Sequence, residues 1–299
     1  MRDVTSLEFL DDPAAFLVAA ETHLEADPVL NTVIASVTQR AAAADAQGRT
    51  RGAEPRWWVL VRDDAGPVVG VAMRTAPFVP YPLYVLPMPD EAAREIARAL
   101  HDRGEAVAAA NGALPAARVL LDELARLTGH AVHVHEHTRL HELGELVVPP
   151  SPPGRLRLAT ADDADLALAW FLAFESAAAE QAGREGTHGM LEGFTLEDMH
   201  ARIDDGVIWF WEDDSGERVH LTGANLPAYG VTRVGPVYTP TAHRGRGYAS
   251  AAVAEVSRQY VEQGVRVCLF TDQANPTSNR IYHALGYRPV VDMVNLLLR

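Results

Sequence analysis

The chain has 299 residues, a formal net charge of −14, 48% apolar residues and 22% charged residues. These values are typical of a globular protein that buries one large core or two ordinary ones. The acidic balance argues against a nucleic-acid backbone as a partner, whereas it would permit a cationic amine as a substrate.

Two further features narrow the class of protein. No apolar run approaches the ~20 residues that cross a bilayer, and residues 1–13 carry acids where a secretory signal would have an apolar core. We therefore expect a cytoplasmic protein with no membrane partner. The single cysteine, Cys268, lies on a predicted core strand, where it is expected to be a small buried apolar side chain.

The first half of the chain alternates helical and strand patterns. Periodicity and turn residues predict, in order, helices 13–25 and 28–46, strands 57–63, 67–75 and 82–88, helix 90–102, strand 105–111, helix 114–128 and strand 130–140. Acids Asp90 and Glu91 occupy the first turn of helix 90–102. They stabilise the helix dipole at that end but would repel a phosphate.

Three histidines, His133, His135 and His137, share one face of strand 130–140, opposite Val132 and Val134. Spaced about 7 Å apart along a strand, they could begin a metal site. No carboxylate or cysteine pattern accompanies them, so we expect a solvated strand face and no metal.

A proline-rich joint divides the chain nearly in half. Residues 149–154 read Pro-Pro-Ser-Pro-Pro-Gly, and proline fixes φ and removes backbone donors, which predicts a stiff extended connector. We expect one domain over residues 1–148, a linker over 149–154 and a second domain over 155–299.

The second half again alternates helices and strands. The patterns predict strand 155–160, helices 162–182 and 195–205, strands 207–213, 217–226 and 228–239, an alanine-rich helix that opens near Tyr248, strand 266–271, a short helix from Pro276 and strand 288–298.

The most informative segment joins strand 228–239 to the helix that follows it. It contains Arg244, Gly245, Arg246, Gly247, Tyr248 and Ala249. Glycines let backbone N–H groups approach a ligand, and a helix N-terminus adds unpaired donors and the positive end of its dipole. The spacing is neither that of a nucleoside-triphosphate loop nor that of a dinucleotide-binding turn. The segment therefore predicts a phosphate or pyrophosphate site of another kind.

Arg244-x-x-Gly247-x-Ala249 resembles the R/Q-x-x-G-x-G/A pyrophosphate loop of the GNAT acetyltransferase superfamily. A second segment supports this resemblance. It runs from Asn275 through Ser278, Asn279 and Tyr282 to Leu285-Gly286-Tyr287, and it is similar to the N-x-x-[AS]-x-x-x-Y…G-[FY] segment that follows the loop in GNAT enzymes. Both segments occur in the family's order, on the expected elements.

The resemblance implies a mixed α/β fold, with a mostly antiparallel sheet flanked by helices, and acetyl-coenzyme A as the co-substrate. Backbone N–H groups of residues 245–249 would then hold the pyrophosphate. The remaining cofactor contacts would come from Val237, Tyr238, Thr239, Asn275, Ser278 and Asn279. Gly235-Pro236 would break the strand ladder beside them, because proline offers no donor.

Tyr282 is, by the same resemblance, the acid that protonates the departing thiolate. As alternatives that use no cofactor, Tyr282 would be a core tyrosine and Asn275 only a helix cap. Many GNAT enzymes place a glutamate on the strand before the loop, but residues 229–239 contain no acid and no histidine. Glu175, Glu212 and His220 are weaker candidates for a base, each expected to be an exposed residue.

The first half has the same cadence as the second but no glycine loop and no tyrosine in helix 114–128. It therefore resembles a degenerate GNAT module, although an unrelated α/β domain would show the same alternation. Two functions stay open: an N-acetyltransferase that acts on a small-molecule amine, and a coenzyme A-binding sensor or scaffold. The chain would act as a monomer or a homodimer.

Overall fold

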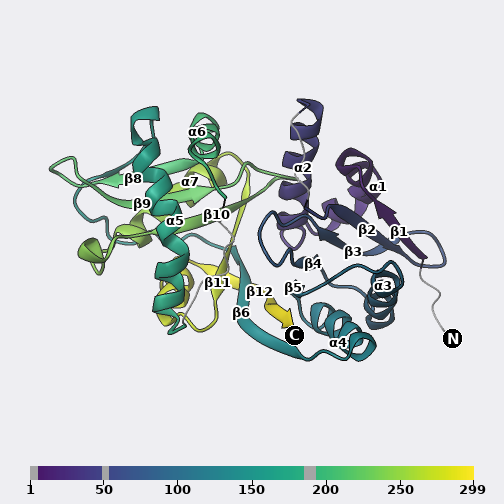
Figure 1. Ribbon diagram of the computed structural model, residues 1–299. Helices are drawn as coiled ribbons and strands as arrows, with labels where there is room; N and C mark the ends of the chain where they lie inside the picture. Colours follow the sequence, from purple (N-terminus) through teal and green to yellow (C-terminus); the bar gives the residue numbers. More distant parts are fainter. Residues whose placement is uncertain (1–5, 49–53, 185–192) are drawn as a thin grey trace. The chain divides into compact units, whose positions relative to one another are not determined.

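The computed structural model describes residues 6–48, 54–184 and 193–299. The chain forms two compact units (Figure 1). Unit 1 comprises Met1–Arg139 together with Val291–Arg299, and unit 2 comprises Leu140–Val290. In the described part of the chain, no helix is both long enough and apolar enough to cross a bilayer.

Unit 1 is a sheet covered by helices. Its elements are β1 (Ser6–Leu10), α1 (Pro13–Ala26), α2 (Thr32–Ala46), β2 (Trp57–Arg62), β3 (Val68–Arg74), β4 (Leu83–Val85), α3 (Asp90–Asp102), β5 (Ala109–Ala113), α4 (Ala116–Thr128), most of β6 (Val132–Leu143) and the end of β12 (Tyr287–Leu298). The strand order is β1-β2-β3-β4-β5-β12. Every neighbouring pair is antiparallel except β4 and β5, which are parallel.

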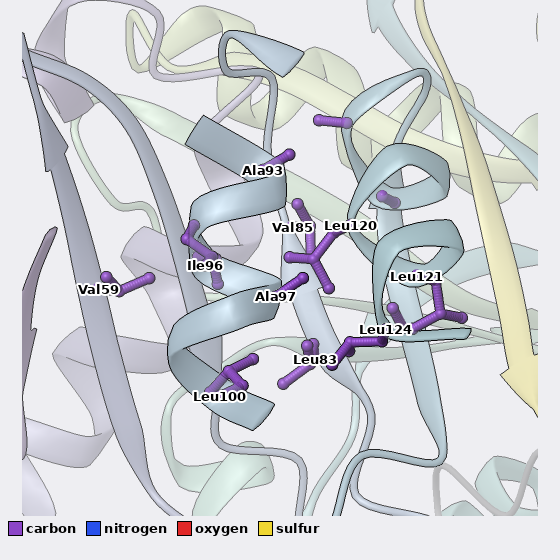
Figure 2. Close-up of a cluster of buried hydrophobic side chains, with 14 of the residues drawn as sticks. Val59, Leu83, Val85, Ala93, Ile96, Ala97, Leu100, Leu120, Leu121 and Leu124 are labelled. Carbon is purple, nitrogen blue, oxygen red and sulfur yellow. The ribbon is translucent and has the colours of Figure 1, made fainter. Parts of the chain in front are cut away.

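One large core cluster of unit 1 lies between the sheet and the helix pair α3 and α4. Figure 2 shows side chains from α3, α4 and β4 converging on one cluster. Ile96 and Leu100 of α3, Leu120 of α4, and Leu83 and Val85 of β4 are fully buried there. Fully burying a side chain of this size contributes about 1.5–3 kcal/mol, so this cluster stabilises the packing of α3 and α4 on the sheet.

Unit 2 has the same kind of sheet. Its elements are β7 (Arg155–Leu158), a short 3₁₀ turn (Ala161–Asp163), α5 (Ala164–Gln181), α6 (Leu196–Asp204), β8 (Ile208–Glu212), β9 (Arg218–Ala224), β10 (Val231–Tyr238), a second 3₁₀ turn (Thr241–His243), α7 (Tyr248–Glu262), β11 (Arg266–Asp272), α8 (Pro276–Ala284) and the start of β12. The strand order is β7-β8-β9-β10-β11, and only β10 and β11 are parallel among these pairs.

Helices cover both faces of the sheet of unit 2. Trp209 packs in a core cluster with Val253 of α7, whereas its neighbour Phe210 packs in another cluster with Phe171 of α5 and Met199 of α6. Successive residues of a strand point to opposite faces. Helix α7 therefore lies on one face of β8, and α5 and α6 lie on the other.

The two units repeat one succession of elements. In each, a hairpin turns at an Asp-Asp-x-Gly sequence, residues 63–66 and 213–216, and shifts register in the strand beside the turn. Tyr81 and Tyr229, with φ of 55° and 48°, are the only non-glycine residues with positive φ in the described ranges, and each precedes the first strand of a parallel pair. The repeat supports the interpretation of two related modules.

The division between the units differs from the boundaries predicted at residues 148 and 155. Residues 291–299 belong to unit 1, because β12 pairs antiparallel with β5 from Met293↔Ala113 to Leu297↔Ala109. Unit 2 begins at Leu140, before the prolines. Residues 149–154 form no helix or strand, as the linker prediction expected, but they lie inside unit 2.

Candidate active site

The parallel strands β10 and β11 separate partway along their length. They pair only at Val231↔Arg266, Thr232↔Val267 and Arg233↔Cys268, although β10 continues to Tyr238 and β11 to Asp272. On its other side, β10 shifts register against β9 between Val234 and Val237. This shift is where Gly235-Pro236 predicted a break in the ladder. The backbone of β10 beyond Arg233 is thereby released from β11.

A loop rich in free backbone donors follows β10. Gly245 and Gly247 have φ of 77° and 87°, and a Cβ added to either would meet nothing within 4 Å. In the described part of the chain, the N–H groups of Gly245, Arg246 and Gly247 donate to no carbonyl. Gly247 is the N-cap of α7 and provides no side-chain cap. Alternating left-handed residues at a helix N-terminus form a concave anion site.

The arginines of the loop are held partly by local carbonyls. Arg244 Nε donates to the Thr239 carbonyl at 3.1 Å, and Arg246 donates to the Ala242 carbonyl at 3.3 Å. Arg244 also lies 4.0 Å from the carboxylate of Glu180 on α5. Tyr248 is 5% exposed and packs against Trp211, so only its backbone N–H can contribute to an anion site.

The start of α8 is built as its sequence predicts. The Asn275 side chain accepts from the N–H groups of Thr277 and Ser278, each at 3.1 Å, and Pro276 occupies the first turn. Asn279 Nδ2 donates to three carbonyls, including that of Asn275 at 2.7 Å. The Asn275 oxygen and the amide donors of this segment therefore serve local structure, and the amide oxygen of Asn279 remains the group most suited to a ligand.

Tyr282 lies on α8 within the core of unit 2. It is 9% exposed, and its ring meets that of Tyr287 edge-on, with centroids 5.9 Å apart. Burial raises its pKa well above the ordinary value of a phenol. The side chain is therefore both a core residue, as one interpretation predicted, and a hydroxyl that stays protonated at neutral pH.

The chain is similar to one protein family and to several solved structures. Residues 215–294 match the FR47-like protein family. Three solved structures are similar over nearly the whole chain. A Drosophila protein is 14% identical, covers 99% of this chain and 98% of its own, and has a TM-score of 0.62. A GCN5-related N-acetyltransferase from Sphaerobacter thermophilus is 18% identical over 98% and 94% of the two chains, with a TM-score of 0.55.

An acetyltransferase of the GNAT family from Colwellia psychrerythraea is 11% identical over 98% and 99% of the chains, with a TM-score of 0.55. No curated protein sequence matches the chain. The chain has the GNAT acetyltransferase fold. The resemblance noted at residues 244–249 and 275–287 is confirmed, and so is the predicted mixed α/β architecture.

The structure shows the surroundings of the three candidate bases, His220, Glu212 and Glu175. His220 on β9 is fully buried, which lowers its pKa to about 3, so the expectation that it is exposed is wrong. Glu212 forms ion pairs with Arg157 and Arg155, and the hydrogen bond from Arg157 lowers its pKa. Glu175 on α5 is half-buried. Neither His220 nor Glu212 suits the role of a base.

The sequence predicts that residues 171–195 and strand 207–226, with interleaved glutamates and aromatic residues, wall the site of the acceptor amine, and that some of these residues lie in the core. Phe171, Trp209 and Trp211 are each 5% exposed and belong to the core. Trp170 is half-buried, and its ring lies 5.8 Å from that of Tyr238 at the end of β10. Glu185 and Glu192, which the sequence places in this wall, lie outside the described residues.

The end of α5 reaches both segments of the GNAT motif, which the sequence did not predict. Glu180 lies beside Arg244, Arg184 forms an ion pair with Asp272, and Asn275 Nδ2 donates to Gln181 Oε1 at 3.4 Å. Helical spacing alone predicts that residues 180–184 share part of one surface. Their partners come from far along the chain, so no local signal identifies them.

In unit 1 the corresponding parallel strands, β4 and β5, do not separate. β4 pairs with β5 over its whole length, and a Cβ added at Gly112 would lie 2.0 Å from the Val85 carbonyl oxygen. Residues 86–89 then lead directly into α3, whose first turn carries Asp90 and Glu91. On β6, His133 and His137 are exposed, and within the described ranges no group of three or more His, Cys, Asp or Glu side chains is arranged to hold a metal ion.

Proposed function

We propose that this chain is an N-acetyltransferase that moves an acetyl group from acetyl-coenzyme A to a primary amine of a small molecule. One observation carries the proposal: β10 and β11 diverge after Arg233 and Cys268, directly before a loop whose backbone donors are unpaired. In the GNAT fold this divergence opens onto a helix N-terminus, and the combination suits an extended ligand with a pyrophosphate.

The residues present fit coenzyme A. The donors of Gly245, Arg246 and Gly247 and the first turn of α7 would hold the pyrophosphate, with Arg244 adding charge. Released backbone groups of Val237, Tyr238 and Thr239 would accept the pantetheine arm. Asn279 would offer its amide oxygen on the other side of the arm, with Asn275 and Ser278 beside it.

The bound acetyl thioester supplies an electrophilic carbonyl carbon. The amine nitrogen would form a bond to that carbon as the carbon–sulfur bond breaks, and the Tyr282 hydroxyl would give its proton to the sulfur. The proton that the nitrogen loses would pass to water, and water would return a proton to Tyr282. A phenol with an ordinary pKa of ~10 is a weaker acid than a thiol at ~8.5, and burial of Tyr282 widens this gap. Burial would also raise the pKa of the coenzyme A thiol in the same place, which brings the difference between the two pKa values back towards its ordinary size.

The acceptor would be positioned from the α5 side of the sheet. Trp170 and Tyr238 form an aromatic wall at the end of β10. Aromatic faces suit a compact cationic amine, which would lose its proton before it reacts.

One observation favours a second function, a coenzyme A-binding sensor or scaffold without turnover. β10 offers no base, Glu212 is engaged by arginines, and His220 is too buried to accept a proton. An enzyme built this way would depend on water to remove the proton of the amine, or on an amine whose pKa is low enough for it to be neutral without a base.

Release of coenzyme A from acetyl-coenzyme A, measured against a panel of amines, separates the two functions. The panel contains polyamines, aminoglycosides, amino acids and neutral arylamines. The proposal expects acceptor-dependent release that is strongest for a cationic amine. Turnover only with neutral or anionic acceptors would contradict the cationic preference, whereas binding of acetyl-coenzyme A without turnover on any amine would favour the sensor.

A further inference from the structure

A fully buried histidine joins two threonines beneath the loop of unit 2. His220 Nδ1 lies 2.7 Å from Thr239 Oγ1, and His220 Nε2 lies 2.8 Å from Thr222 Oγ1. His220 and Thr222 have no exposed surface. A neutral imidazole has one donor and one acceptor nitrogen, and a hydroxyl can act as either. Both ring nitrogens are therefore satisfied in the core.

The position of Thr239 makes this chain of contacts relevant to the loop. Thr239 is the first residue after β10, and its carbonyl accepts the hydrogen bond of Arg244 Nε at 3.1 Å. Its side chain is thus fixed from the sheet, and its carbonyl fixes the arginine of the loop. If Thr239 turned away, His220 Nδ1 would remain in the core without a partner, which is costly.

Unit 1 has no histidine at the position that corresponds to His220. Gly70 pairs with Val61 as His220 pairs with Trp211, in each case directly before the register shift of the hairpin. A Cβ added at Gly70 would lie 2.5 Å from Met88 Cβ. In unit 1 the short connection after β4 fills the space with Met88, so there is neither a histidine nor a long loop for it to hold.

We propose that His220 is a positioning residue that fixes the loop of residues 239–247 in its ligand-binding conformation by holding Thr239. This inference rests on the proposed function, because the ligand of the loop is taken to be coenzyme A. His220 exchanges no proton with the ligand; it acts through Thr239 and, one bond further, through Arg244.

Two matched variants test the proposal by calorimetric titration with coenzyme A. Thr239→Val and Thr222→Val each remove one hydroxyl from His220 and keep the side-chain shape, so each should lower the melting temperature. Only Thr239→Val should raise the Kd of coenzyme A, by about five- to tenfold, the effect of losing one ordinary hydrogen bond. The KM of acetyl-coenzyme A should rise by the same factor in Thr239→Val, whereas Thr222→Val should keep the wild-type KM.

A second pair tests the histidine itself. His220→Asn keeps a polar atom near the place of Nδ1 and should retain most of the affinity, whereas His220→Ala should lose as much as Thr239→Val. Equal affinities of wild type and Thr239→Val would overturn the proposal, as would equal losses in the two threonine variants. A wild-type protein that binds no coenzyme A would overturn the proposed function and this inference with it.

Discussion

The two units of this chain show what a binding site adds to a fold. Both have a hairpin, a parallel pair of strands and a helix after the first strand of that pair. In unit 1, β4 has 3 residues and residues 86–89 lead to α3. In unit 2, β10 has 8 residues and residues 239–247 lead to α7. The additional residues of β10 and of the loop after it are the part of unit 2 that does not pair with β11.

The difference has a physical cost that falls on unit 2 alone. Unit 1 satisfies the backbone of β4 with two strands and covers it with α3 and α4 (Figure 2). Unit 2 leaves backbone groups of β10 without β11 and holds Gly245 and Gly247 in the left-handed region. Unpaired polar groups are disfavoured unless water or a ligand meets them. The comparison teaches that the same succession of elements forms without an open strand pair, and that only unit 2 leaves groups unpaired where the proposed ligand would bind.

The largest expected effect concerns Tyr282 on α8. The corresponding helix of unit 1, α4, has no tyrosine. Tyr282→Phe keeps the ring and deletes the proton, so kcat should fall by about 10²–10⁴-fold, the range for a general acid, with little change in the affinity for acetyl-coenzyme A. Because burial raises the pKa of Tyr282, its ionisation should not reduce wild-type kcat below about pH 10. Steady-state kinetics under conditions where chemistry limits the rate measures both.

Tyr287→Phe is the matched control for this variant. Tyr287 packs against Tyr282 and is fully buried, but its hydroxyl is held 2.8 Å from Ser257 Oγ and has no part in the proposed chemistry. Its loss should lower stability and leave kcat near that of wild type. Equal kcat values for the two variants would remove the acid role from Tyr282.

The second effect compares the starts of α1 and α5. Asp163 is 1% exposed, and its carboxylate receives hydrogen bonds from Arg157 and Arg218, whereas Asp12 caps α1 at the surface. Burial opposes ionisation of Asp163, but the hydrogen bonds of Arg157, Thr160 and Arg218 outweigh it and hold its pKa well below the usual range. Asp163→Asn should therefore cost about 3 kcal/mol of unfolding free energy at neutral pH.

The pH dependence of this loss gives a further check. A lowered pKa contributes stability that is fully present above the unfolded-state pKa of ~3.9 and disappears as the pH falls towards the folded-state value. The difference between wild type and Asp163→Asn should thus shrink below about pH 4 in melting experiments. Asp12→Asn, which exchanges one good helix cap for another, should show almost no difference at any pH.

The third effect concerns the loop itself. Coenzyme A at ~100 times its Kd should stabilise the wild type by about 2.7 kcal/mol, seen as a shift of the melting temperature. Gly247→Asp puts a negative charge into the anion site and should abolish this shift. Gly264→Asp introduces the same charge at a glycine of similar φ, 75°, with open space around it, beyond the other end of α7. It should keep the shift, and loss of the shift in both variants would contradict a specific site.

Local patterns predicted much of the fold. Helix α3 runs over Asp90–Asp102 as predicted, and strands β2, β3, β8 and β9 lie within two residues of the predicted ranges, because hydrophobic periodicity and turn residues act over short distances. Strand β1 was missed, since its short run sits among acids. The transfer of residues 291–299 to unit 1 was also missed, because periodicity does not specify the strand with which a segment pairs.

The candidate site was also predictable only where its features depend on local sequence. Gly245, Gly247, Asn275 and Pro276 carry signals in their own type and order, and the loop and cap form where these residues predict. The burial of His220 and its contacts with two threonines depend on the register of β9 against β10 and on the cover of α7. No property of the sequence near residue 220 reports that arrangement.

The most direct test of the difference between the units is a crystal structure of the full chain with coenzyme A. The account predicts electron density for one ligand per chain, with its pyrophosphate against the N–H groups of residues 245–247 beside Arg244, and none beside Asp90. Density at Asp90, alone or together with density at Arg244, would contradict the assignment of the ligand site to unit 2 only.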